Sequence, residues 1–291
     1  MLLDGKVPHL YRSQNSQVSP AAHAALAAPR NVPRRIYAFW CRTPSHGNVG
    51  DALTPWLIRR VTGHYPMFAR PGDPITKFFV SGSIVDYTRE HCVVWGSGII
   101  SRADRVSRHA TFLAVRGPLT REVALAYHAS CPAIYGDPAL LLPRLYRSPV
   151  ISRSGIGIVP HFSEKPRFNA RPADAHAFRI IDVQQSVESF VDQVVACEVI
   201  GSSSLHGIIV AHAYGIPAAW IKFRDLPSGD DSKFHDYFLS VGEPVPAPLR
   251  MDPSKVDIAC VTEHARLPNN LPDLDLLWEC CPFRPASSGP G

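Results

Sequence analysis

Short apolar runs alternate along the chain with segments that repeat apolar residues at helical spacing. The first series of runs occupies residues 35–40, 77–80, 92–95 and 112–115, and a second series follows at 155–159, 179–183, 198–201 and 218–221. Runs this short and rich in β-branched and aromatic residues are typical of strands buried on both faces of a parallel sheet. The pattern therefore predicts two successive sets of parallel strands.

The intervals between these runs have the pattern of amphipathic helices. The clearest helix begins at Asp51, which can cap it, carries four apolar residues on one face and ends at Gly63. Further helices are expected at 118–127, where Pro118 opens the first turn, and at 187–196, 205–214 and 274–281, with a short one at 21–28. The alternation of strands and helices predicts an α/β fold of two doubly wound, Rossmann-like domains that face a cleft.

Changes in composition suggest where these domains begin and end. The first 33 residues are rich in Ala, Ser, Pro and His, a polar stretch lies near 148–154, and a Pro-rich tail follows residue 245. We therefore expect a loosely ordered N-terminal arm at 1–33, an N-terminal Rossmann-like domain at 34–150 and a C-terminal one at 151–245. A tail with a last helix would occupy 246–291.

Charge and cysteine content exclude several functional classes. The net charge of +5 is spread over scattered Lys and Arg, which argues against a nucleic-acid binder but suits an anionic small substrate or brief contact with an anionic membrane. The 7 cysteines form no CxxC pair and no zinc-like spacing, so neither a disulfide framework nor a metal site is expected. Neither a signal peptide nor an apolar stretch long enough for a membrane span is evident, which favours a cytoplasmic protein.

Small and polar residues follow nearly every predicted strand. Ligands in doubly wound sheets bind beyond the carboxyl ends of the strands, so these residues form the candidate site. Asn48 and Asp51 can bind a hydroxyl group or cap a helix, and glycines let a ligand approach the backbone. Gly96-Ser97-Gly98 lacks the third glycine of a dinucleotide fingerprint, so NAD is not expected. The candidates on the first series of strands are Asn48, Asp51, Ser81, Gly82, Gly96, Ser97 and Gly98.

The segment Ser202–Gly207 gives the strongest local signal in the second half. It places the hydroxyls of Ser202, Ser203 and Ser204, the amides around Leu205 and the imidazole of His206 at the start of a helix. Unpaired N–H groups and the helix dipole favour an anion such as phosphate there. The alternative is that Ser203 or Ser204 only caps the helix while His206 packs in the core.

Three further side chains are candidates for binding or proton transfer. Arg116 ends a strand and precedes a helix, so it can contact a carboxylate or phosphate in bidentate fashion, or pair with a neighbour such as Glu122. His161 ends another strand and would face the cleft, unless it is a solvated loop residue. With unperturbed pKa values near 6.5, His161 and His206 would suit general acid–base catalysis. Lys233 can reach the cleft or lie on the surface.

Seven segments in series form a recognisable set. They are GNVGDALTPWLI (47–58), VWGSGI (94–99), AVRGPLT (114–120), YGDPALLLP (135–143), IVPHF (158–162), SSSLHGIIVAHAYGIPA (202–218) and KFHDYF (233–238). In this order and at these spacings they resemble the polysaccharide pyruvyltransferase family. The resemblance covers roughly residues 35–245 and the final helix, and it is closest to enzymes that ketalate precursors of xanthan and succinoglycan.

This resemblance implies a glycosyltransferase-B-like fold with the acceptor on the N-terminal domain and the donor on the C-terminal one. It implies transfer of pyruvyl from phosphoenolpyruvate to a sugar of a lipid-linked exopolysaccharide precursor, with release of phosphate and no cofactor or metal. Arg116, His161 and His206 match residues that matter in the family. Some members carry Arg where this chain has Ser204, and Lys222 or Lys233 could replace that charge.

The lipid-linked acceptor implied by the resemblance would bring the protein to the cytoplasmic face of the membrane. Two other functions remain open at this point. The first is a sugar-nucleotide-dependent glycosyltransferase of the same architecture, and the second is a sugar-phosphate binding protein without turnover.

Overall fold

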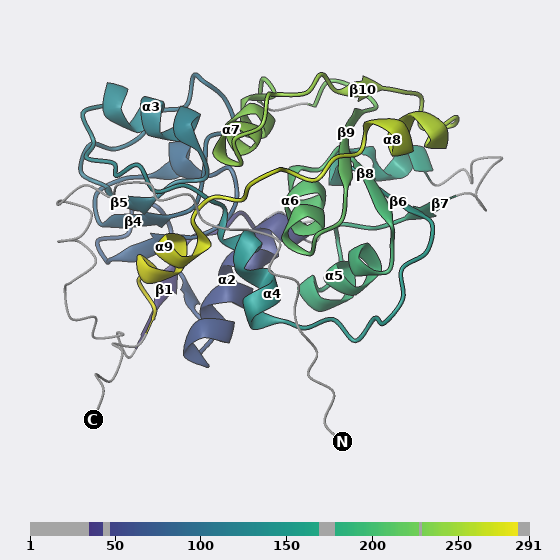
Figure 1. Cartoon of the computed structure of the whole chain (residues 1–291). Coiled ribbons are helices and arrows are strands. Elements are labelled where there is room, and N and C mark those ends of the chain that lie inside the picture. The colour runs from purple at the N-terminus through teal and green to yellow at the C-terminus, as the bar shows by residue number, and fades with distance from the viewer. Residues whose placement is uncertain (1–34, 43–46, 169–177, 227–228, 285–291) are drawn as a thin grey trace.

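The computed structural model describes residues 35–42, 47–168, 178–226 and 229–284. The expected N-terminal arm, with its short helix, lies outside these residues. The described chain is an α/β protein with two five-stranded sheets, one on the left and one on the right of Figure 1. Both sheets are parallel throughout, as the sequence pattern predicts.

The first sheet contains every strand of the first predicted series. Its order is β2-β1-β3-β4-β5, and all four neighbouring pairs are parallel. Phe79, Val94 and Ala114 are fully buried because helices cover both faces of the sheet. The strands are β1 (Tyr37–Ala38), β2 (Met67–Phe68), β3 (Lys77–Phe79), β4 (Cys92–Trp95) and β5 (Thr111–Ala114).

The second sheet repeats this topology with the second series of strands. Its order is β10-β9-β8-β6-β7, again with parallel pairs. The strands are β6 (Ile156–Val159), β7 (Phe178–Ile180), β8 (Val199–Ser202), β9 (Ala218–Lys222) and β10 (Leu249–Arg250). In each sheet the strand that comes first in sequence lies second from one edge, so the direction in which successive strands are added reverses between β1 and β3 and between β6 and β8. Ligands of doubly wound sheets bind at such reversals.

The main helices lie close to the predicted ranges, with one correction at a helix start. Helix α2 (Val49–Thr62) is capped by Asn48, whose side chain accepts hydrogen bonds from the Gly50 and Asp51 N–H groups, and not by Asp51. Gly63 ends the helix in the left-handed conformation, with φ 75°, as expected for a C-cap glycine. The other helices of this group are α3 (Pro118–Ala126), α5 (Val187–Val195) and α6 (Leu205–Ala213).

Short elements also connect the strands of the two sheets. They are η1 (Val85–Tyr87), η2 (Pro138–Leu141), α4 (Leu142–Leu145) and η3 (Phe162–Phe168). Helix α6 packs against η2, and α2 packs against α5, where the Trp56 indole donates to Glu188 at 2.7 Å. One continuous cluster of buried apolar side chains therefore includes residues from both halves.

The C-terminal part contains helices that the sequence pattern does not reveal. Helix α7 (Ser232–Ser240) packs against α3 of the first half, and α8 (Ile258–His264) packs against β9. The expected last helix is α9 (Leu274–Glu279), and it lies beside the first sheet (Figure 1). There the Trp95 indole donates to the Leu277 carbonyl at 2.9 Å, and Phe283 packs on Phe78. None of the described helices is long and apolar enough to cross a membrane.

Candidate functional site

The strand reversals of both sheets place candidate residues on either side of the boundary between the two halves of the chain, which we call the seam. Asn48 and Ser81 follow β1 and β3 of the first sheet, while His161 and Ser203 follow β6 and β8 of the second. The backbone N–H of Val49 donates to the Val183 carbonyl at 2.7 Å, which joins the start of α2 to the second half. The predicted residues thus come together from segments that are more than 100 positions apart.

His206 lies at the centre of this seam, in the first turn of α6. It is 8% exposed, and its Nε2 atom lies 3.1 Å from the Ser81 hydroxyl and 3.5 Å from Asp137 Oδ2. On its other side the ring packs on Gly50, where a Cβ atom would come within 2.3 Å of Nδ1. A glycine is needed at that position because any side chain would displace the imidazole. His206 is therefore buried, as the core alternative expects, but its partners are polar groups of the first half.

Asp137 is the site residue that sequence reasoning missed. It is fully buried, and its Oδ1 accepts from the Ser81 hydroxyl and the Ala139 N–H, both at 3.0 Å. Its Oδ2 has no hydrogen-bond partner among the described residues. Burial alone would raise the pKa of Asp137, but the imidazole of His206, 3.5 Å from Oδ2, and the hydrogen bond from the Ala139 N–H outweigh burial and lower that pKa. In sequence, Gly136-Asp137-Pro138 has only the pattern of a turn.

Asp51 differs from its expected role as a helix cap. Its carboxylate accepts from Asn48 Nδ2 at 2.7 Å, while Asn48 does the capping. Burial raises the pKa of Asp51 to about 6, although the charge of His206 opposes the shift. A carboxyl group with this pKa beside a histidine can give or take a proton near neutral pH.

The serine segment before α6 does not cap the helix. The expectation that Ser203 or Ser204 caps it is therefore wrong. Ser204 occupies the N-cap position but its side chain makes no capping hydrogen bond. The Ser203 hydroxyl donates to Glu164, and the Ser202 hydroxyl contacts the Val159 and Ser204 carbonyls. Within the described ranges, the backbone N–H groups of Leu205 and His206 have no hydrogen-bond partner, as an anion site at a helix start requires.

His161 does not have the unperturbed pKa that the sequence analysis assumes. Its backbone N–H donates to the Ser203 hydroxyl at 2.9 Å, and its Nδ1 lies 2.9 Å from the Ser163 hydroxyl. Burial lowers the pKa of His161 to about 3, and the nearby charges of Lys233 and Arg224 contribute. The ring is therefore neutral at physiological pH, because a charged ring would be desolvated by burial and repelled by two nearby cations.

The two candidate lysines have different surroundings. Lys222 Nζ contacts Asp225 at 2.8 Å and Asp231, so its charge is already paired. Lys233 Nζ forms no hydrogen bond or ion pair in the part of the chain that the structure describes, and it lies 5.4 Å from the Phe234 ring. Burial, helped by the charge of Arg116, lowers the pKa of Lys233 to about 8. Of the two, only Lys233 has an ammonium group without an ion-pair partner among the described residues.

Arg116 is fully buried, and its guanidinium contacts protein groups. It donates to Asp236 of α7 at 3.1 Å, to the Ser83 hydroxyl at 2.7 Å and to the Ile99 carbonyl. The pair with Glu122 that the sequence left open is not formed, since Glu122 pairs with Arg102 at 2.8 Å instead. The role of Arg116 in binding a donor stays a prediction.

Protein atoms fill the space beside two of the predicted ligand-approach glycines, Gly96 and Gly98. A Cβ on Gly96, whose φ is +92°, would lie 2.1 Å from Pro138, and one on Gly98 would lie 2.4 Å from the Arg116 guanidinium. Gly82 also has a positive φ, of 102°. Ser97 is fully buried, and its hydroxyl has no partner among the described residues. Gly96 and Gly98 therefore serve tight packing around Pro138 and Arg116, whereas a Cβ on Gly82 would meet Ile84 only at 3.7 Å.

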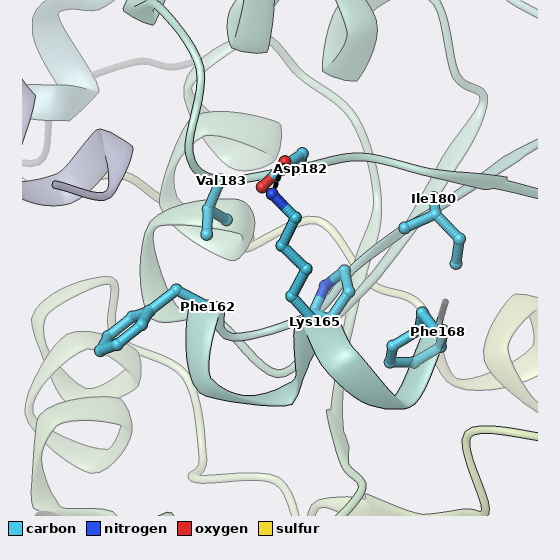
Figure 2. Close-up of a pocket in the computed structure, with 7 residues that line it drawn as sticks. Phe162, Lys165, Phe168, Ile180, Asp182 and Val183 are labelled. Atoms are coloured by element: carbon cyan, nitrogen blue, oxygen red, sulfur yellow. Dashed lines mark ion pairs between the residues drawn. The ribbon is translucent and has the colours of Figure 1, made fainter. Parts of the chain in front are cut away.

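An apolar pocket of about 140 Å³ lies next to this site, beyond the ends of β6 and β7. Figure 2 shows aromatic rings on its walls and an ion pair between Lys165 and Asp182, 2.6 Å apart. None of the predicted site residues lines it, although Phe162 directly follows His161. Its lining residues are Pro160, Phe162, Lys165, Phe168, Ile180, Asp182 and Val183. In the described ranges, no three His, Cys, Asp or Glu side chains gather in a way that could hold a metal ion.

Comparison with known proteins identifies the family. An uncharacterized protein of Acanthamoeba polyphaga mimivirus is 30% identical over 171 residues, which are 55% of this chain and 58% of that protein. The chain thus spans little more than half the length of this curated relative. No solved structure matches the chain. Residues 28–223, which include the seam residues from Asn48 to His206, match the family described as polysaccharide pyruvyl transferase. The chain therefore belongs to the polysaccharide pyruvyl transferase family.

Proposed function

We propose that the protein is a ketal pyruvyltransferase that moves the pyruvyl group of phosphoenolpyruvate to a sugar of a lipid-linked exopolysaccharide precursor and releases phosphate. The observation that carries the proposal is the contact of His206 with Ser81 across the two strand reversals, near enough to Asp51 for the charge of His206 to act on that carboxyl, in a chain of this family. The two Rossmann-like halves would enclose the substrates in a glycosyltransferase-B-like cleft. Catalysis would need neither a metal nor a cofactor.

The donor is an anion with a carboxylate and a phosphate, and the second half offers groups for both. Leu205 and His206 present unpaired N–H groups at the positive end of α6. Lys233 adds an ammonium without an ion-pair partner among the described residues, and Arg224, held by the Ser163 carbonyl and hydroxyl, lies beside the same cluster. Lys233 is thus the stronger substitute for the arginine that some family members carry at the position of Ser204, because Lys222 is already paired.

The reaction needs a proton donor for C3 of phosphoenolpyruvate and a base for the sugar hydroxyl. Asp51, with a pKa raised to about 6, is suited to protonate C3, which makes C2 cation-like. His206 would take the proton of the hydroxyl that attacks C2. The bond from C2 to the phosphate oxygen then breaks, and the departing phosphate takes the proton from His206. The second hydroxyl bonds to C2 and closes the cyclic ketal, and its proton passes to the Asp51 carboxylate. His161 is neutral in this site and would act as a hydrogen-bond group toward the donor.

The test is to incubate the protein with phosphoenolpyruvate and a crude lipid-linked oligosaccharide fraction and to assay inorganic phosphate. Phosphate release that depends on the acceptor supports the proposal. Nucleotide release from a nucleoside-diphosphate sugar would indicate a glycosyltransferase instead, and donor binding without turnover would indicate a binding protein.

The matched variant for this assay is His206→Ala. We expect it to remain folded and to lose at least about 100-fold in rate, the usual worth of general acid–base help. Collapse of its thermal unfolding transition would assign His206 to the core instead.

A further inference from the structure

The hydrogen-bond chain behind His206 determines which of its ring nitrogens carries the proton. Ser81 Oγ lies 3.0 Å from Asp137 Oδ1 and 3.1 Å from His206 Nε2. An ionised carboxylate can only accept, so the Ser81 hydroxyl donates to Asp137 and its oxygen is left to accept from His206. The hydrogen on the neutral imidazole must therefore be on Nε2.

The second carboxylate oxygen of Asp137 supports the same conclusion. Asp137 Oδ2 is fully buried, has no hydrogen-bond partner among the described residues, and lies 3.5 Å from Nε2. A buried carboxylate oxygen without a partner is costly unless a positive charge faces it. The imidazolium that His206 becomes on accepting a proton would provide that charge.

The opposite ring nitrogen faces the first turn of α2. Nδ1 has no hydrogen-bond partner in the described part of the chain, and it packs on Gly50, next to Asn48 and Asp51. With the hydrogen on Nε2, the lone pair is on Nδ1, the ring nitrogen that lies against the first turn of α2 at Gly50, between Asn48 and Asp51 in sequence.

From this geometry we infer that Asp137 is a positioning residue, which acts through Ser81 to hold His206 as the Nε2–H tautomer and makes Nδ1 the base. This inference rests on the proposed function. In the step concerned, the sugar O–H bond breaks, its proton joins the Nδ1 lone pair, and the oxygen forms a bond to C2. Nε2 keeps its hydrogen, and Asp137 stays ionised opposite the imidazolium.

The direct test is a nitrogen-15 NMR measurement on histidine-labelled protein without substrate. Two-bond proton–nitrogen correlations report which ring nitrogen is protonated, and His206→Gln identifies the signal. We expect the Nε2–H form in the native protein. In Asp137→Asn the amide can donate to Nε2, so the ring should switch to the Nδ1–H form. A native His206 in the Nδ1–H form would overturn the inference without any variant.

The kinetic test compares Asp137→Asn with Ser81→Ala and with Asp257→Asn. Asp137→Asn should lower kcat at least about 100-fold while the KM for phosphoenolpyruvate holds, because the base is in the wrong tautomer. Ser81→Ala should cost about 10-fold, the worth of one hydrogen bond. Asp257 caps α8 on the surface, and Asn caps as well, so this control should keep native activity.

The two hypotheses fail in different ways. If the native protein releases no phosphate from phosphoenolpyruvate but His206 switches tautomer in Asp137→Asn, the proposed function is wrong and the positioning role stands. If the native protein turns over and a folded Asp137→Asn keeps kcat, the positioning role is wrong. If Asp137→Asn does not fold, Ser81→Ala with an unchanged kcat and tautomer leads to the same conclusion.

Discussion

Among individual residues, Lys233 gives the most direct test of donor binding. Its ammonium has no ion-pair partner in the described ranges, and its pKa of about 8 means that it is charged below pH 8 and loses its charge above. We expect Lys233→Met to raise the KM for phosphoenolpyruvate about 10-fold or more with a smaller change in kcat, since an ionic contact to a ligand contributes about 1.5–3 kcal/mol. In the native protein, donor affinity should fall as the pH rises through 8.

Lys222→Met is the informative comparison for this prediction. Lys222 pairs with Asp225 and Asp231. Its loss should therefore lower the melting temperature and leave the donor affinity nearly unchanged. Donor affinity that depends on Lys222, or that stays constant between pH 7 and 9, would contradict the assignment of Lys233.

Asp51 should show a trade-off between stability and activity. Its pKa is raised in the folded state to about 6, so ionisation is unfavourable there, and the resulting stability is present below pH 4 and lost as the pH rises through 6. Asp51→Asn keeps the shape and removes this loss. We expect the variant to be more stable at pH 8 by about 3 kcal/mol, equally stable at pH 4, and less active at both.

Urea unfolding at the two pH values measures the first part of this prediction. The assay of phosphate release measures the second. A variant with native turnover would show that the proton for C3 comes from another group.

At the level of elements, Arg116 connects helix α7 to the first half of the chain. Its partner Asp236 also accepts from the Thr120 N–H and hydroxyl at the start of α3, and both Arg116 and Asp236 are fully buried. Gly117 lies against the same place, since a Cβ there would come within 2.0 Å of the Asp236 carbonyl. The segment Arg116-Gly117-Pro118 therefore forms the surface on which α7 packs.

Arg116→Lys should destabilise the protein by about 2 kcal/mol, because an ammonium cannot reach Asp236, Ser83 and Ile99 together, and loss of a partner from a buried pair costs about 3–5 kcal/mol. Arg102→Lys is the matched control. It alters an exposed pair with Glu122, so little change is expected. Denaturant unfolding and calorimetric donor titration decide the matter. Native stability with weakened donor binding would restore Arg116 as a donor ligand.

For the whole molecule, the proposed lipid-linked acceptor predicts loose, salt-sensitive attachment to an anionic membrane surface. The basic residues expected to make this contact are Arg30, Arg34, Arg35, Arg59 and Arg60. Arg30 and Arg34 lie outside the described residues. Arg35 and Arg59 are exposed, while Arg60 pairs with Glu188 at 3.1 Å. Each free basic residue near an anionic leaflet contributes about 1 kcal/mol.

Flotation with anionic liposomes at low and high salt tests the attachment. We expect binding at low salt that disappears at high salt, because the attraction is screened over a Debye length of about 10 Å at 0.1 M. Arg35→Gln with Arg59→Gln should weaken it. Absence of low-salt binding would refute the idea. The last helix, α9, is not expected to insert into the membrane, since its apolar residues Leu276 and Leu277 are buried.

Much of the architecture is local in origin, and the sequence by itself was sufficient for it. The apolar runs overlap eight of the ten described strands, and Gly63 and Pro118 end and begin helices as the sequence pattern predicts. The seven motifs also placed the chain in its family. Helix α7 and the short strands β2 and β10 were missed, because packing against distant segments rather than local periodicity stabilises them.

Tertiary structure alone decided how the site works. His206 meets Ser81 125 positions away, and Arg116 meets Asp236 120 positions away, so no local pattern could reveal either contact. The altered pKa values of His161, Asp51 and Lys233 have the same origin, because each arises from burial by other parts of the chain. Sequence therefore determined which chemical groups lie at the ends of the strands. The folded structure determined which of them are paired, buried and left free to act.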